Sequence, residues 1–238
     1  ATSEIREVNI GFNRMAQRLS KIEQDRALML AGISHDLRTP LARLRLETEM
    51  SVADPQAREH MAADIEQVNA IIDKFLDYAR PDHLNPEQVS LNEVVETAVF
   101  ALGQQPDFVV KTSIPPDTRV MGDAVELQRV FSNLLENALR YGRNPDTGVV
   151  HVDVAARAND DAVLIKLRDH GQGVRPDILA QLTQPFFRGD ESRSAATGTG
   201  LGLAIVDRAI ARMGGRFALA NSSTGGLAAH IKLPKAPS

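Results

Sequence analysis

The most reactive side chain that the sequence presents is His35, in the stretch Ser34-His35-Asp36-Leu37-Arg38-Thr39-Pro40-Leu41. Apolar residues recur around it at steps of three and four, which predicts a helix with one apolar stripe: Leu30, Ile33, Leu37, Leu41 and Leu44. His35 falls on the opposite face, so we expect an exposed imidazole with a free lone pair. Thr39 lies one turn further on, and Pro40 loosens the helix because it has no N–H for the carbonyl of Asp36. Taken alone, a histidine on a solvated helix face is usually an ordinary surface residue.

A second group of residues points to nucleotide binding. Asn133 and Asn137 stand four residues apart on a predicted helix, and their amide oxygens suit a Mg²⁺ held mainly by phosphates, although such a pair is also a common polar flank. Asp169-His170-Gly171-Gln172-Gly173 follows a predicted strand. Its glycines allow close approach of a flat ligand, and Asp169 can accept a hydrogen bond from an exocyclic amine. On its own this pattern is also a common turn.

A glycine-rich segment, Gly198-Thr199-Gly200-Leu201-Gly202-Leu203, precedes another predicted helix. Its N–H groups can meet phosphate oxygens at the positive helix end. The segment is not a Walker A loop, because it lacks Lys-Ser/Thr, and not a Rossmann fingerprint, because it follows a long polar segment instead of a strand. Residues 184–196 are polar apart from Pro185-Phe186-Phe187, which predicts a mobile lid anchored by two aromatic side chains.

Helices must position His35. Before it, apolar residues recur at the spacing of a coiled-coil seam: Ile5, Val8, Phe12, Met15, Leu19 and Ile22. The seam changes phase between Ile22 and Leu30, although a simple helix with an imperfect pattern explains these residues as well. Ala53-Asp54-Pro55 predicts a turn into a second helix that stops before Pro81. Two antiparallel helices with one stripe each cannot bury both stripes alone. We therefore predict a homodimer with a four-helix bundle and His35 facing outward.

Residues 81–86 form a polar linker and a predicted domain boundary. Beyond it, helix and strand patterns mix, with Ser90 and Asp123 as helix caps and Glu126 three residues after the second cap. Helices are expected within 89–102, from 124 to 141 and over 201–212, and strands over 108–112, 149–155, 162–167, 215–220 and 227–233. A layer of helices over a mixed sheet, an α/β sandwich, follows.

Composition restricts the class of protein. The 238 residues suffice for one large or two modest domains, and 43% hydrophobic with 24% charged residues is typical of a globular protein. The formal net charge of −4 does not suggest a nucleic-acid partner. The absence of cysteine excludes disulfides and thiolate metal sites. No apolar run is long enough to cross a bilayer and no signal peptide opens the chain, so a soluble piece is expected.

Together these motifs resemble the sequence boxes of two-component sensor histidine kinases. In chain order they resemble the H box (34–41), N box (133–141), G1 box (169–173), F box (185–190) and G2 box (198–203). The H box and the segment 69–78 are similar to those of EnvZ-type osmosensor kinases, and the N-terminal seam resembles the last helix of a HAMP linker. The resemblance implies a HAMP end (1–22), a dimeric phosphotransfer hairpin (23–80), a hinge (81–86) and a catalytic ATP-binding domain of the Bergerat (GHKL) type (87–238).

The resemblance also implies a reaction. The γ-phosphoryl group of ATP would pass to His35 and then to an aspartate in the receiver domain of an OmpR-type response regulator. Asp36 would bond the other ring nitrogen of His35, and Thr39 would serve dephosphorylation of the regulator. In the family such a chain is the cytoplasmic portion of a bacterial inner-membrane protein, joined to the membrane by an N-terminal part.

For the nucleotide site the resemblance implies that Asn137 coordinates Mg²⁺, Asn133 and Arg140 support the phosphates, Tyr141 lines the site and Asp169 recognises adenine. It extends the same site to residues of the glycine motifs and the F box: Gly171, Gly173, Arg188, Gly198, Gly200, Leu201, Gly202 and Leu203.

Two other classes share part of this pattern. A gyrase-like or chaperone-like ATPase of the same nucleotide fold would have Asn137, Asp169 and the glycines, but gives no reason for a hairpin with His35. A degenerate kinase that acts only as a dimeric scaffold would keep the hairpin and lose nucleotide-binding residues, yet none is missing.

Overall fold

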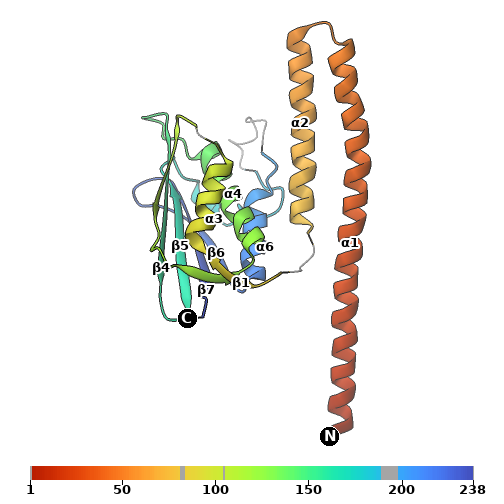
Figure 1. The fold of residues 1–238 in the computed structure, drawn as a ribbon, viewed down its shortest axis with the longest axis vertical. Coiled ribbons are helices and arrows are strands. Elements are labelled where there is room, and N and C mark those ends of the chain that lie inside the picture. Colours follow the sequence, from red (N-terminus) through yellow and green to blue (C-terminus); the bar gives the residue numbers. More distant parts are fainter. Residues whose placement is uncertain (1, 81–83, 104, 189–197, 238) are drawn as a thin grey trace. The chain divides into compact units, whose positions relative to one another are not determined.

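The computed structural model describes residues 2–80, 84–103, 105–188 and 198–237. The chain divides into two compact units, Ala1–Asp82 and His83–Ser238. The first is a helical hairpin and the second an α/β domain (Figure 1). None of the helices formed by the described residues is long and apolar enough to span a membrane.

The hairpin consists of two helices, α1 (Thr2–Ser51) and α2 (Pro55–Tyr78). Helix α1 is a single helix of 50 residues that continues through Pro40, so the expected boundary between residues 22 and 23 lies inside a helix. The predicted turn is confirmed, because Asp54 caps α2 by accepting a hydrogen bond from Gln56 N at 3.1 Å.

Apolar and ionic contacts join the two helices. Ile65 and Ile72 of α2 are buried. An ion pair joins Arg45 to Glu66 at 2.7 Å, and another joins Arg38 to Asp73. The predicted stripe on α1 is only partly covered by these contacts, because three of its members are about half exposed in the single chain: Ile33 (48%), Leu37 (46%) and Leu44 (50%).

The second unit is an α/β sandwich, as predicted. Its main sheet has the strand order β2-β4-β5-β7-β6, in which only β2 and β4 are parallel among the neighbouring pairs. Helices α3, α4 and α6 lie on one face of this sheet (Figure 1). The elements are β1 (Glu87–Ser90), α3 (Leu91–Ala101), β2 (Phe108–Ser113), β3 (Arg119–Gly122), α4 (Ala124–Tyr141), β4 (Val150–Ala158), β5 (Ala162–Asp169), α5 (Pro176–Leu179), α6 (Gly202–Arg212), β6 (Arg216–Asn221) and β7 (Leu227–Pro234).

Sequence reasoning missed three elements of this unit. Strands β1 and β3 pair with each other in a separate antiparallel sheet, and the short helix α5 follows the G1 box. Strands β1 and β3 have only four residues each, so alternation of apolar and polar residues in them cannot be distinguished from a turn.

Both predicted helix caps are confirmed in the α/β unit. Ser90 accepts a hydrogen bond from Glu93 N, and Asp123 Oδ1 accepts from Val125 N at 2.9 Å and from Glu126 N at 3.1 Å. The second oxygen of Asp123 accepts from Asn85 N at 3.0 Å, and Leu84 packs against the core. Residues 84 and 85 of the predicted linker are therefore attached to the α/β unit, while 81–83 lie outside the described residues.

Candidate nucleotide and phospho-acceptor sites

His35 is exposed on α1, as the stripe predicted. Its side chain is 82% exposed, and Nδ1 lies 3.4 Å from Oδ1 of Asp36, which is 85% exposed. With Nδ1 beside this carboxylate, Nε2 is the ring nitrogen that remains available for reaction. Thr39 Oγ1 donates a hydrogen bond to the carbonyl oxygen of His35 at 3.3 Å, which places its hydroxyl on the same turn.

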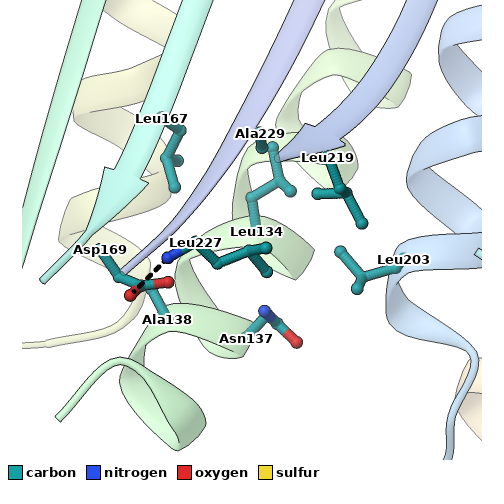
Figure 2. A pocket seen from close by; sticks show the side chains of 9 residues that line it. All are labelled: Leu134, Asn137, Ala138, Leu167, Asp169, Leu203, Leu219, Leu227 and Ala229. Atoms are coloured by element: carbon teal, nitrogen blue, oxygen red, sulfur yellow. Dashed lines mark hydrogen bonds between the residues drawn. The ribbon is translucent and has the colours of Figure 1, made fainter. Parts of the chain in front are cut away.

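A pocket in the α/β unit brings together the N box, the G1 box and the G2 helix. It is a hollow open to solvent between α4, α6 and the sheet (Figure 2). Most of its wall is apolar, and Asn137 and Asp169 supply the polar groups. The lining residues are Leu134, Asn137, Ala138, Leu167, Asp169, Leu203, Leu219, Leu227 and Ala229. Apolar walls with few convergent polar groups suit a flat heteroaromatic ligand.

Asp169 is the fixed polar group of this pocket. It is only 6% exposed, and its Oδ1 accepts a hydrogen bond from Gly171 N at 2.9 Å. The same oxygen accepts from Leu227 N at 3.1 Å, the bond drawn in Figure 2. These two donors set the orientation of the carboxylate and leave Oδ2 for a ligand. Sequence reasoning did not identify Leu227, although the Gly225-Gly226 pair before an apolar strand was a usable signal of a close approach.

Glycines allow the chain to pass close to Asp169. Gly226 has φ +84°, and a Cβ there would lie 1.9 Å from the carbonyl oxygen of Asp169. A Cβ on Gly171 would lie 2.9 Å from Cα of Gly142. We expected Gly171 to admit a ligand, and the structure shows that its lack of a side chain also admits the end of the N-box helix.

Gly173 has a neighbour that the sequence did not reveal, Asn221 at the end of β6. A Cβ on Gly173 would lie 2.8 Å from Asn221 Oδ1. That oxygen accepts from Val174 N at 2.9 Å, and Asn221 Nδ2 donates to the carbonyl of Val174 at 2.5 Å. The amide of Asn221 therefore fixes the end of the G1 box to the edge of the sheet.

Two further side chains hold the ends of this loop. His170 Nε2 lies 2.7 Å from Asp153 Oδ2 on the neighbouring strand β4. The Arg168 guanidinium donates to the carbonyl of Gly225 at 2.9 Å. The G1 box is thus bonded both to β4 and to the β6–β7 connection.

A basic group lies at Gly198, the first glycine of the G2 box. A Cβ on Gly198 would lie 2.8 Å from Tyr141 Oη, 3.3 Å from Arg140 Nη1 and 3.9 Å from Arg188 Nε. The structure therefore brings these four predicted site residues together. Two guanidinium groups beside a glycine backbone are suited to phosphate oxygens.

The F box packs on the G2 box. Phe186 N donates to the carbonyl of Gly200 at 2.9 Å, and a Cβ on Gly200 (φ +69°) would lie 2.8 Å from Phe187 O. Phe186 itself has φ 63° and is 58% exposed. Residues 189–196 of the predicted lid lie outside the described residues.

Helix α6 begins directly after these glycines. Its N-cap residue Leu201 is fully buried and has an apolar side chain that cannot cap the first turn. Gly202 is the first residue of the helix, and Leu203 lines the pocket. The first N–H groups of α6 are therefore suited to an anion.

The two predicted asparagines lie in different surroundings. Asn137 lines the pocket. Asn133 is buried at the contact of α4 with α6, where Nδ2 donates to the carbonyl of Arg129 at 2.8 Å and Oδ1 would lie 3.4 Å from a Cβ on Gly202. Asn133 thus supports the helix that carries Asn137 and does not line this pocket.

The donor set fits a Mg²⁺ that is held mainly by a nucleotide. Within the described ranges, no three His, Cys, Asp or Glu side chains are grouped to hold a metal ion. The neutral amide oxygen of Asn137 would supply one ligand, and phosphate oxygens would supply the charge.

Comparison with known proteins identifies the family. Residues 25–84 match the His Kinase A (phospho-acceptor) domain, and residues 122–237 match the histidine kinase-, DNA gyrase B- and HSP90-like ATPase family. The chain belongs to the sensor histidine kinases. Its α/β unit is therefore of the GHKL type, as predicted, and its hairpin is the phospho-acceptor unit.

Curated relatives agree with this assignment. Sensor histidine kinase CpxA of Escherichia coli K12 is 31% identical over 234 residues, which cover 94% of this chain and 50% of that protein. Sensor protein PfeS of Pseudomonas aeruginosa is 33% identical over 241 residues, which cover 98% of this chain and 52% of that protein. The chain thus spans about half the length of the curated relatives it matches.

Solved structures share the fold. Full-length ShkA in complex with AMPPNP has a TM-score of 0.70 at 23% identity, covering 88% of this chain and 46% of that one. Histidine kinase ThkA in complex with the response regulator TrrA has a TM-score of 0.63 at 19% identity, covering 95% of this chain and 67% of that one.

Proposed function

We propose that this sensor histidine kinase phosphorylates His35 from ATP and passes the phosphoryl group to an aspartate of an OmpR-type receiver domain. One observation carries the proposal: an exposed imidazole with Nδ1 beside a carboxylate occurs in the same chain as a pocket with a fixed carboxylate and an apolar wall. A clamp-type ATPase has no use for the first feature, and a scaffold has no use for the second.

In the proposed transfer, the lone pair of His35 Nε2 attacks the γ-phosphorus while the bond from that phosphorus to the bridging oxygen breaks, and ADP leaves. Nδ1 keeps its proton, and the Asp36 carboxylate offsets the positive charge that develops on the ring. Such transfers depend mainly on positioning and charge neutralisation. Exposure of His35 permits the approach of both ATP and the regulator.

For the nucleotide we propose adenine in the apolar pocket, with its exocyclic amine on Asp169 Oδ2. Arg140, Arg188 and the N–H groups at the start of α6 would bind phosphate oxygens. Asn137 would hold Mg²⁺, which neutralises phosphate charge when bound. The likeness in fold to ShkA, which was solved with AMPPNP, supports a nucleotide at this site.

We further propose a homodimer formed by the hairpin. Ile33, Leu37 and Leu44 are about half exposed in one chain, and a second hairpin would cover them in a four-helix bundle. The phospho-acceptor family match over residues 25–84 supports this arrangement. His35, on the opposite face of α1, would remain accessible.

Four finer assignments complete the proposal. Thr39 would orient water in dephosphorylation of the regulator, and the hinge would let the α/β unit reach His35. The regulator would be of the OmpR type, as the likeness to EnvZ-type kinases implies, and the fold shared with ThkA, solved with the response regulator TrrA, supports a receiver-domain partner. We also propose that residues 1–22 are the end of a HAMP linker, which joins this chain to the bacterial inner membrane from the cytoplasmic side.

The test is incubation of the chain with γ-labelled ATP and Mg²⁺, comparing the native chain with His35→Gln. Acid-labile, alkali-stable label is expected in the native chain and none in the variant. His60→Gln is a matched control, because it removes another exposed imidazole from the hairpin. Label that persists in His35→Gln would place the acceptor elsewhere, and bound nucleotide without label would favour a scaffold.

A further inference from the structure

The main sheet of the α/β unit has an open face that the nucleotide site does not use. Helices α3, α4 and α6 cover the other face (Figure 1), where Val150, Val152 and Val154 of β4 are buried. Residues directly opposite each other in neighbouring strands share a face, so the register defines what the open face presents.

Each of the five strands contributes a cation to the open face. In the observed register, Lys111 is opposite Asp153, Asp153 is opposite Arg168, Lys166 is opposite Ala155 and His230, and Lys232 is opposite Leu164 and Arg216. We call this set the basic face: Lys111 of β2, Arg157 of β4, Lys166 and Arg168 of β5, Lys232 of β7 and Arg216 of β6. All are exposed except the half-buried Arg168.

The charge of this face is opposite to that of the chain as a whole. Among the described strand residues the basic face has one carboxylate, Asp153, and that carboxylate is bonded to His170. The chain as a whole has a formal net charge of −4. Burial and the charge of Lys166 both lower the pKa of His230, which lies in the middle of the face. Such concentration of one charge sign on one face indicates an anionic partner.

The chemistry of the face favours lipid over protein or nucleic acid. Protein interfaces usually have aromatic or large apolar anchors at their centre, and RNA-binding sheets stack bases on aromatic side chains. Within the described part of the sheet, the basic face carries no Phe, Tyr or Trp side chain, and its larger apolar side chains are Val109 and Leu164. The face of a five-stranded sheet is also too broad to enter a DNA groove, which admits a helix or a two-stranded ribbon.

We propose that the basic face docks on a bilayer that contains anionic phospholipids. Headgroups form a flat and laterally mobile anionic surface, which requires charge and area but no shape complementarity. This inference rests on the proposed function in one respect, because it is there that the chain is placed next to a membrane. Docking gives the α/β unit a second attachment to that membrane, independent of the N-terminal one.

The test is flotation of the full chain with vesicles of phosphatidylcholine containing about one third phosphatidylglycerol. Lys166→Gln with Lys232→Gln should lower the vesicle partition coefficient roughly 25-fold at low salt. The matched control is Arg119→Gln with Lys235→Gln, which removes the same charge from exposed residues outside the face and should leave binding nearly unchanged. Binding of the native chain should fall steeply as salt is raised.

Four results would overturn the proposal: no flotation of the native chain, equal flotation with pure phosphatidylcholine, equal losses in the two double variants, or retention by duplex DNA or polyglutamate without flotation. Flotation needs no ATP, and none of the four substituted residues belongs to the nucleotide site. Label on His35 in solution should therefore be the same in both double variants. Flotation without any label would contradict the proposed function and leave the lipid site standing.

Discussion

Asp169 and His35 are prepared for their proposed tasks in opposite ways. Asp169 is buried, and two backbone N–H groups bind one of its oxygens, so a ligand meets a carboxylate whose direction is already set. His35 is exposed and has one long contact with Asp36, so its ring can be reached by different partners in turn. In the proposed function, nucleotide recognition thus rests on a rigid group, and phosphoryl transfer rests on an accessible one.

Substitution of Gly226 tests whether nucleotide binding needs Asp169 in its observed position. Gly226→Ala should destabilise the α/β unit and abolish ADP binding, because the new Cβ would lie 1.9 Å from the Asp169 carbonyl oxygen. Gly225→Ala is the matched control, since Gly225 has a similar φ of +91° but its nearest atom lies at 3.6 Å. The control should lose about 1–2 kcal/mol of unfolding free energy. Equal losses in urea unfolding would show that backbone strain, and not the contact with Asp169, matters.

Substitution of Thr39 tests the proposed role of its hydroxyl in dephosphorylation of the regulator. Thr39→Ala should retain label on His35 and lose dephosphorylation of the regulator at least tenfold, because the hydroxyl on the same turn would no longer orient water. Thr39→Ser keeps a hydroxyl and should retain most of that activity. Both rates can be followed with labelled regulator. A variant that loses kinase activity while dephosphorylation stays intact would refute the assignment.

Among the elements, helix α4 depends on Asp123 at its start. Burial alone would raise the pKa of Asp123, but the N–H groups of Asn85, Glu126 and Val125 and the charge of Arg212 outweigh it and lower the pKa. A carboxyl group with a lowered pKa stabilises the fold at pH values above its unfolded pKa of about 3.9. That stability is lost as the pH falls through this value and below it.

Asp123→Ala should therefore lower the unfolding free energy at pH 7 by about 1–2 kcal/mol. Asp123→Asn should keep much of the cap and show a weaker decline of stability below about pH 4 than the native chain. Urea titrations across this pH range measure both effects. Asp160→Asn, in an exposed turn, is the control and should decline as the native chain does.

Local signals in the sequence were sufficient to predict most of the helices and strands. Asp54, Ser90 and Asp123 mark helix starts through their own side chains, and α4 and α6 lie within about one residue of the predicted ranges. The contacts that build the pocket are not local. Leu227 N reaches Asp169 across 58 positions, and Asn221 reaches Val174 across 47. No periodicity reports such pairs, because they depend on which strands become neighbours.

The glycines illustrate the same limit within the candidate site. Their positions were predicted, but the reason was only partly anticipated. Gly171 and Gly200 each face protein backbone at 2.9 Å or less from a Cβ position, in addition to any ligand they admit. A sequence shows that a side chain is absent and does not show what occupies the space.

For the whole molecule, assembly through the hairpin is the main expectation. Leu37→Glu should convert the dimer into monomers in light scattering, because it places a charge in the half-exposed stripe. Arg43→Glu, on an exposed position of the same helix outside the stripe, should remain dimeric. ADP affinity should be unchanged in both variants, since the α/β unit has its own core. A dimeric Leu37→Glu chain would place the interface elsewhere.

The order of strands has a consequence for biosynthesis. Among the strands of the main sheet, β7 is translated last, yet it lies between β5 and β6, and its first N–H holds Asp169. A ribosome-bound chain can therefore complete its hairpin long before the pocket exists. The pocket around Asp169 therefore forms only after β7 has emerged from the ribosome.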